Sequence, residues 1–121
     1  MTNLSPEKMA WIAQECGWPA QGKLRFKRGQ QVVTVDEYYL GDELMAKVTK
    51  NDGGRFTLAG ERVVMERFEL MPRIQGTGGR KRFYMNERMK IPPEDIEWSD
   101  NYSQAIHAAM DKISGEALKA R

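Results

Sequence analysis

The chain has 121 residues, with 19 basic and 17 acidic side chains, a formal charge of +2, one cysteine and one histidine. Cys16 alone cannot form an internal disulfide, and Cys16 with His107 cannot supply the ligands of a Cys/His zinc site. Length and composition therefore predict a single folded domain over residues 1–121 that contains no metal and no cofactor.

The first residues of the chain contain no signal for secretion. They lack the basic start and apolar run of a signal peptide, and no later stretch approaches the apolar length of a membrane-spanning helix. We therefore expect a cytoplasmic protein.

The N-terminal segment predicts a helix over residues 6–16. Ser5 is placed to cap the helix, Pro6 occupies a position that needs no N–H, and Gly17 supplies a left-handed stop. Four apolar side chains recur at helical spacing: Met9, Ile12, Ala13 and Cys16. On this face Cys16 is expected to be a buried apolar residue rather than a reactive thiol.

Residues 22–74 change from the helical period to the alternation typical of short strands. A β-branched run covers residues 31–35, and an Asn-Asp-Gly-Gly turn at residues 51–54 separates two further strands. A turn at residues 59–61 is then expected to lead into a strand over residues 62–67. Such a meander should curl and close, because open strand edges invite pairing with other chains.

The stretch from Phe26 to Met71 resembles the Src-homology-3-like small barrels of KOW, Tudor and related modules. The resemblance lies in the residues that open the first strand: Phe26, Gly29, Val32 and Val35. It implies a small antiparallel barrel over residues 22–74, and it carries no functional residues over.

The last third of the chain predicts a link, a hairpin and a helix. The sequence Gly-Thr-Gly-Gly at residues 76–79 is interpreted as the link, and residues 80–91 as a hairpin that turns about residues 86–88. An apolar stripe predicts a helix over residues 100–114 that is closed by Gly115. The predicted fold class is therefore α+β, with a barrel flanked by an N-terminal and a C-terminal helix and an extra hairpin.

His107 is the one side chain that could serve in histidine-dependent catalysis. It lies away from the centre of the stripe between Tyr102 and Ile113, so it should flank the apolar face or be exposed. Without a second histidine or a neighbouring nucleophile, a catalytic role for His107 is not supported.

Charge is distributed unevenly along the chain. Residues 21–40 hold four basic and two acidic side chains, and residues 61–90 hold eight basic and four acidic. Residues 91–121 hold three basic and six acidic side chains. The basic segments are also the ones with interleaved aromatic residues, which is typical of surfaces that contact nucleic acid.

Strand alternation gathers the basic residues on one face. Arg25 and Lys27 flank Phe26, and Arg80 and Arg82 repeat this arrangement near aromatic residues. The candidate nucleic-acid-binding residues are Lys23, Arg25, Lys27, Arg28, Arg80, Lys81, Arg82 and Tyr84. The alternative is that these are solvated strand faces whose long side chains cover the core.

Two other hypotheses, a nucleotide-binding loop and a ribonuclease site, concern residues 76–88 and have less support in the sequence. Residues 76–81 resemble a phosphate-binding loop only superficially, because the lysine precedes a β-like run, and a hairpin tip or hinge fits them better. Tyr84, Glu87 and Arg88 offer the groups of a small ribonuclease that works without histidine, with Glu87 as base and Arg88 stabilising charge. Their spacing is not specific.

The leading functional hypothesis from the sequence is a non-catalytic protein-binding module or inhibitor. It depends on large side chains expected at the surface: Tyr38 and Tyr39 in a loop after the first strand, Trp11 off the core face of its helix, and Met45. In style the chain is similar to small accessory proteins that phages and mobile elements use against host machinery. A nucleic-acid-binding module is the alternative, and a ribonuclease is the third hypothesis.

Overall fold

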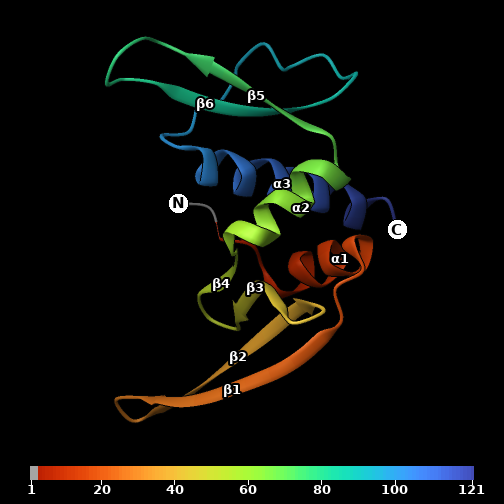
Figure 1. Cartoon of the computed structure of the whole chain (residues 1–121), viewed down its shortest axis with the longest axis vertical. Coiled ribbons are helices and arrows are strands. Elements are labelled where there is room, and N and C mark those ends of the chain that lie inside the picture. The colour runs from red at the N-terminus through yellow and green to blue at the C-terminus, as the bar shows by residue number, and fades with distance from the viewer. Residues whose placement is uncertain (1–2) are drawn as a thin grey trace.

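The computed structural model describes residues 3–121. Three helices form a middle layer between a four-stranded sheet and a two-stranded sheet (Figure 1). In chain order the elements are α1 (Pro6–Cys16), β1 (Ala20–Arg28), β2 (Gln31–Leu40), β3 (Glu43–Thr49), β4 (Gly53–Phe56), α2 (Leu58–Arg67), β5 (Leu70–Gln75), β6 (Arg82–Glu87) and α3 (Tyr102–Lys119). Both sheets are antiparallel, so the predicted α+β class is confirmed.

The four-stranded sheet is open, in contrast to the predicted barrel. Its order is β1-β2-β3-β4, and within residues 3–121 no pairing joins β4 to β1. The prediction of a Src-homology-3-like barrel over residues 22–74 is therefore not confirmed. The open edge of β4 is partly covered by the N-terminal segment, because Leu4 and Gly54 form an isolated antiparallel bridge.

Residues 58–67 form the helix α2, so the predicted turn at residues 59–61 and strand over residues 62–67 are wrong. Thr57 caps this helix, because its side-chain oxygen accepts a hydrogen bond from the Gly60 N–H at 3.2 Å. The Thr57 hydroxyl also donates to the Leu44 carbonyl at 2.6 Å, which ties the start of the helix to β3. Gly60 lies inside the helix, where an added Cβ would overlap the Met45 carbonyl oxygen of β3. Gly60 thus permits a close approach between helix and sheet rather than forming a turn.

The predicted hairpin over residues 80–91 is also wrong in its pairing. β6 pairs with β5, and the turn is the glycine-rich segment at residues 76–81 rather than residues 86–88. The interpretation of residues 76–81 as a hairpin tip is confirmed. Gly76 and Gly78 have positive φ angles of 91° and 69°, which explains why glycine is used there.

The two terminal helices were predicted with different success. For α1 the bounds, the Ser5 cap and the left-handed Gly17 are all confirmed, with the Lys8 N–H donating to the Ser5 Oγ at 3.2 Å. For α3 the cap is Asn101, which accepts from the Gln104 N–H at 2.8 Å. The helix does not stop at Gly115 but continues to Lys119.

One cluster of buried side chains joins the three layers. It contains Leu4, Met9, Ile12, Ala13, Trp18, Met45, Ala46, Val48, Phe56, Val64, Leu70, Met85, Ala105, Ile106 and Met110. The distal half of the β1–β2 hairpin contributes nothing to this cluster and remains largely exposed. The body of the protein is therefore packed around the helices, and the β1–β2 hairpin extends from it.

Candidate functional site

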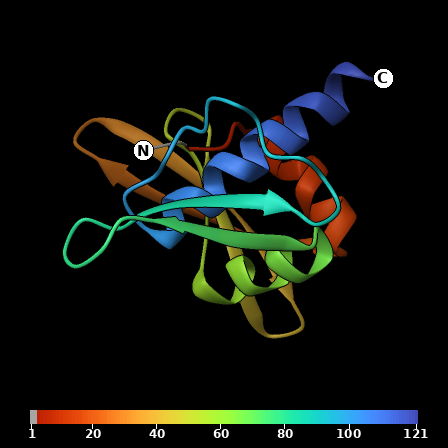
Figure 2. The same ribbon diagram turned by 90° about the horizontal axis from the view of Figure 1, so that it is seen from above.

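Two hairpins extend from the helical layer at opposite ends of the long axis of the molecule. The distal part of β1–β2, residues 23–36, is called the first arm, and the β5–β6 hairpin, residues 70–87, is called the second arm. In Figures 1 and 2 the tips of both arms reach toward the same side of the molecule. Each arm carries four basic residues and one acidic residue, which is Asp36 in the first arm and Glu87 in the second.

The first arm has one apolar and one basic face. Leu24 pairs with Val35 and Phe26 with Val33, so these side chains share a face, and Leu24 is 53% exposed. The basic residues on the opposite face are Lys23, Arg25 and Lys27. The sequence prediction that Arg25 and Lys27 lie together, opposite Phe26, is confirmed.

The second arm presents a row of side chains across three extended segments. Arg73 of β5 pairs with Tyr84 of β6, and Phe83 forms a bridge with Ser99 of the following loop. The neighbouring pair is Tyr84 with Trp98, whose ring centroids lie 6.5 Å apart in an edge-on arrangement. Arg73, Tyr84 and Trp98 therefore form a continuous row, which we call the aromatic row.

Arg82 extends the aromatic row along β6. It is two residues before Tyr84, so it lies on the same face of the strand. Arg80 and Lys81 follow at the exposed hairpin tip. Arg80, Lys81, Arg82 and Tyr84 are predictable from the sequence as members of this surface. Arg73 and Trp98 are not, because their place beside Tyr84 depends on strand pairing that no local pattern encodes.

Most of the positive charge on the arms is not neutralised by neighbouring carboxylates. Of the eight basic arm residues, only Arg28 forms an ion pair within the described residues 3–121, with Asp52 at 3.2 Å. Arg28 also lies over the Phe26 ring, 5.8 Å from its centroid. The remaining seven cations are free to contact an anionic partner.

The residues proposed for protein binding do not form one surface. Met45 is buried at 2% exposure, which contradicts its expected place at the surface. Trp11 is half-buried and packs on Phe68, with ring centroids 5.8 Å apart. Tyr38 and Tyr39 lie within β2 and not in a loop, and both are half-buried.

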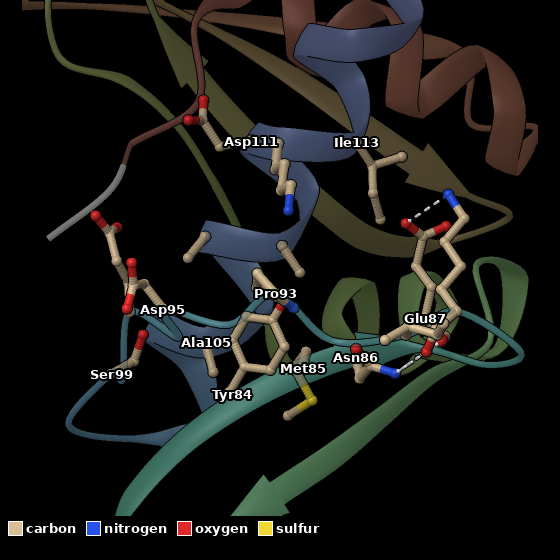
Figure 3. A pocket seen from close by; sticks show the side chains of 16 residues that line it. Tyr84, Met85, Asn86, Glu87, Pro93, Asp95, Ser99, Ala105, Asp111 and Ile113 are labelled. Carbon is tan, nitrogen blue, oxygen red and sulfur yellow. Dashed lines mark hydrogen bonds and ion pairs between the residues drawn. The ribbon is translucent and has the colours of Figure 1, made fainter.

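A cleft of about 520 Å³ lies between β6, the loop that follows it and α3 (Figure 3). Tyr84 and Glu87, two of the three ribonuclease candidates, line it at separate positions. Glu87 forms an ion pair with Lys90 at 3.1 Å. Arg88 does not line the cleft and instead contacts Glu69 at 3.7 Å. The structure therefore does not bring the three candidates together.

His107 is buried at 1% exposure, which contradicts its expected place at the flank of the stripe. Its Nε2 accepts a hydrogen bond from the Phe56 N–H at 3.1 Å, and its Nδ1 contacts the Ser103 carbonyl at 2.7 Å. This pattern requires the neutral ring with the proton on Nδ1. Burial lowers the pKa of His107, although the Ser103 hydrogen bond and nearby Glu61 partly offset this effect. His107 joins α3 to β4 and has no access to solvent.

Cys16 is half-buried against the core, and burial raises its pKa to about 11. Smaller effects come from Arg67, which lowers the pKa, and from Glu15, which raises it. A thiol with this pKa is almost entirely protonated at neutral pH, and the thiolate is the reactive form. We expect iodoacetamide to alkylate Cys16 much more slowly in the folded protein than in denaturant at the same pH. Mass spectrometry over time measures both rates, and equal rates would contradict the expected protection.

Comparison of the chain with protein-family models, with curated proteins and with solved structures finds no match. Among residues 3–121, no group of three or more histidine, cysteine, aspartate or glutamate side chains is placed to hold a metal ion. Within the same residues, no helix is long and apolar enough to cross a membrane.

Proposed function

We propose that the protein binds nucleic acid through its two basic arms. The observation that carries this proposal is that each of the two projecting arms holds four basic residues against one carboxylate, although the whole chain has a charge of only +2. Positive charge that is concentrated on exposed hairpins attracts a phosphate backbone, and binding releases counterions from it. The near-neutral total results from the acidic last third of the chain.

The geometry also favours this function over protein binding. The two arms extend toward one side of the molecule, so a single extended ligand could contact both (Figures 1 and 2). The side chains offered for protein binding are partly or fully within the body, as Met45 and Trp11 illustrate.

The proposal is tested by reversing charge on the first arm. In the double variant Arg25→Glu/Lys27→Glu, affinity for a labelled oligonucleotide should fall at least about ten-fold, and the slope of log affinity against log salt should decrease by about two. Fluorescence anisotropy across a salt series measures both quantities. The loss should be uniform across sequences, because phosphate contacts carry no base information.

The matched control is Arg62→Glu/Lys119→Glu, which causes the same change in net charge on the exposed surfaces of α2 and α3. It should retain most of the affinity and most of the salt slope. An equal loss in both double variants would argue against a specific role for the arm. Absence of binding by the unmodified protein to single-stranded and duplex oligonucleotides at about 50 mM salt would overturn the proposed function.

A further inference from the structure

The outer face of the second arm differs from that of the first in one chemical respect. Both present cations, but only the second arm places two aromatic rings among them, because Tyr84 lies between Arg73 and Trp98 in the aromatic row. The Tyr84 and Trp98 side chains are partly exposed, and Arg73 is exposed. Tyr84 also lines the cleft beside β6, so the row borders that cleft and is partly open to a ligand.

An aromatic ring beside an arginine can bind a nucleic-acid base, which a basic patch alone does not recognise. The flat face of a base stacks on an aromatic ring, and the neighbouring guanidinium contacts the phosphate that leads to the next base. In a duplex the base faces are covered by stacking on their own neighbours. Only unpaired bases can therefore occupy the aromatic row.

We propose that the aromatic row is a base-stacking site and that the preferred ligand is a single-stranded nucleic acid. This inference rests on the proposed function and specifies its substrate class. Bases stack on Tyr84 and Trp98, while Arg73 and Arg82 contact the backbone.

The charge around the aromatic row determines on which side of the row the backbone of the bound strand lies. The loop between β6 and α3 carries the acidic side chains Glu94, Asp95, Glu97 and Asp100. Trp98 belongs to this loop, whereas Arg73 lies on the opposite side of Tyr84. Phosphates are therefore repelled from the Trp98 side, so the backbone follows Arg73 and Arg82 and the bases point toward Trp98.

The first test uses the unmodified protein. Its affinity for an oligodeoxythymidylate is compared with its affinity for an abasic strand of the same length, which has the same phosphates and no bases. Stacking on the row should make the base-bearing strand bind about ten-fold more tightly at equal salt. Equal affinities would overturn the stacking site while leaving phosphate binding by the arms intact.

The second test compares Tyr84→Leu with Tyr84→Phe. The leucine variant lacks an aromatic face and should bind the oligodeoxythymidylate about ten-fold more weakly, whereas the phenylalanine variant keeps the ring and should bind normally. Affinity for a duplex of equal length should not distinguish the variants, and thermal unfolding monitors their folding. An equal loss of single-strand and duplex affinity in a folded Tyr84→Leu protein would contradict the inference.

The failures of the two proposals can be distinguished. If the unmodified protein binds none of the three ligands (the oligodeoxythymidylate, the abasic strand and the duplex), the proposed function and the stacking site are both wrong. If it binds all three with similar affinity and salt dependence, the basic arms are supported and the stacking site is overturned.

Discussion

Gly60→Ala is expected to destabilise the protein by about 3 kcal/mol or more, because an added methyl group would collide with backbone that cannot move aside. The methyl group would overlap the Met45 carbonyl oxygen, and Met45 itself is buried in β3. Relief of the overlap requires α2 to shift away from the sheet, which opens the core beside Val64. Urea unfolding monitored by circular dichroism measures the change in the free energy of unfolding.

Gly115→Ala is the matched control, since Gly115 is also within a helix and the substitution is identical. An added Cβ at Gly115 would meet only the Lys8 side chain, at 3.6 Å. Alanine is favoured over glycine in a helix interior by about 1 kcal/mol, so this variant should be as stable as the unmodified protein or more stable. A similar free energy of unfolding for both variants would show that α2 does not depend on close contact with β3.

Replacement of His107 by leucine should lower the free energy of unfolding by about 2 kcal/mol, because the substitution leaves a buried donor without a partner. The Phe56 N–H donates to His107 Nε2, and the two rings also pack with centroids 4.9 Å apart. His107→Gln is the informative control, since its side-chain oxygen can accept the same hydrogen bond. A glutamine variant no more stable than the leucine variant would indicate that packing, and not the hydrogen bond, dominates.

The same side chain gives the stability of the protein a dependence on pH. Burial lowers the pKa of His107 in the folded state, so the unfolded chain binds its proton more readily. The contribution of the neutral His107 ring to the free energy of unfolding is complete at pH values above about 6.5, the pKa of histidine in the unfolded chain. This contribution decreases as the pH falls from that value toward the lower pKa of His107 in the folded state. The charged ring would lose its acceptor for the Phe56 N–H.

Urea unfolding at about pH 7.5 and at about pH 5 measures this dependence, and the glutamine variant provides the baseline for carboxylates that titrate in the same range. The unmodified protein should lose more stability between the two values than His107→Gln does. An equal decrease in the free energy of unfolding for both proteins would show that the pKa of His107 does not differ between the folded and unfolded states.

Features encoded within a few residues were predictable from the sequence. The start of α1 depends on Ser5 and Pro6 and its end on Gly17, all adjacent to the helix they delimit. The turn between β3 and β4 is equally local, with Gly53 at a φ angle of 78°. The positive charge of the arms was predictable for the same reason, because it is a property of short contiguous segments.

Features that depend on partners distant in the sequence were missed. The role of Gly60 is set by Met45 in another element, so a local reading mistook a packing position for a turn. His107 is polar, and its burial is explained only by the hydrogen bond that the distant Phe56 N–H donates. The aromatic row likewise depends on the pairing of Arg73 with Tyr84, which tertiary structure establishes.

The free edge of β1 has a consequence for the behaviour of the protein in concentrated solution. β1 is nine residues long and is the terminal strand of its sheet, so its outer backbone groups could pair with another copy of the chain. If two copies of β1 paired antiparallel about Arg25, Lys23 of one copy would lie opposite Lys27 of the other. These like charges would oppose edge-to-edge association in that register, so we expect the residues proposed to bind phosphate also to disfavour aggregation through this edge.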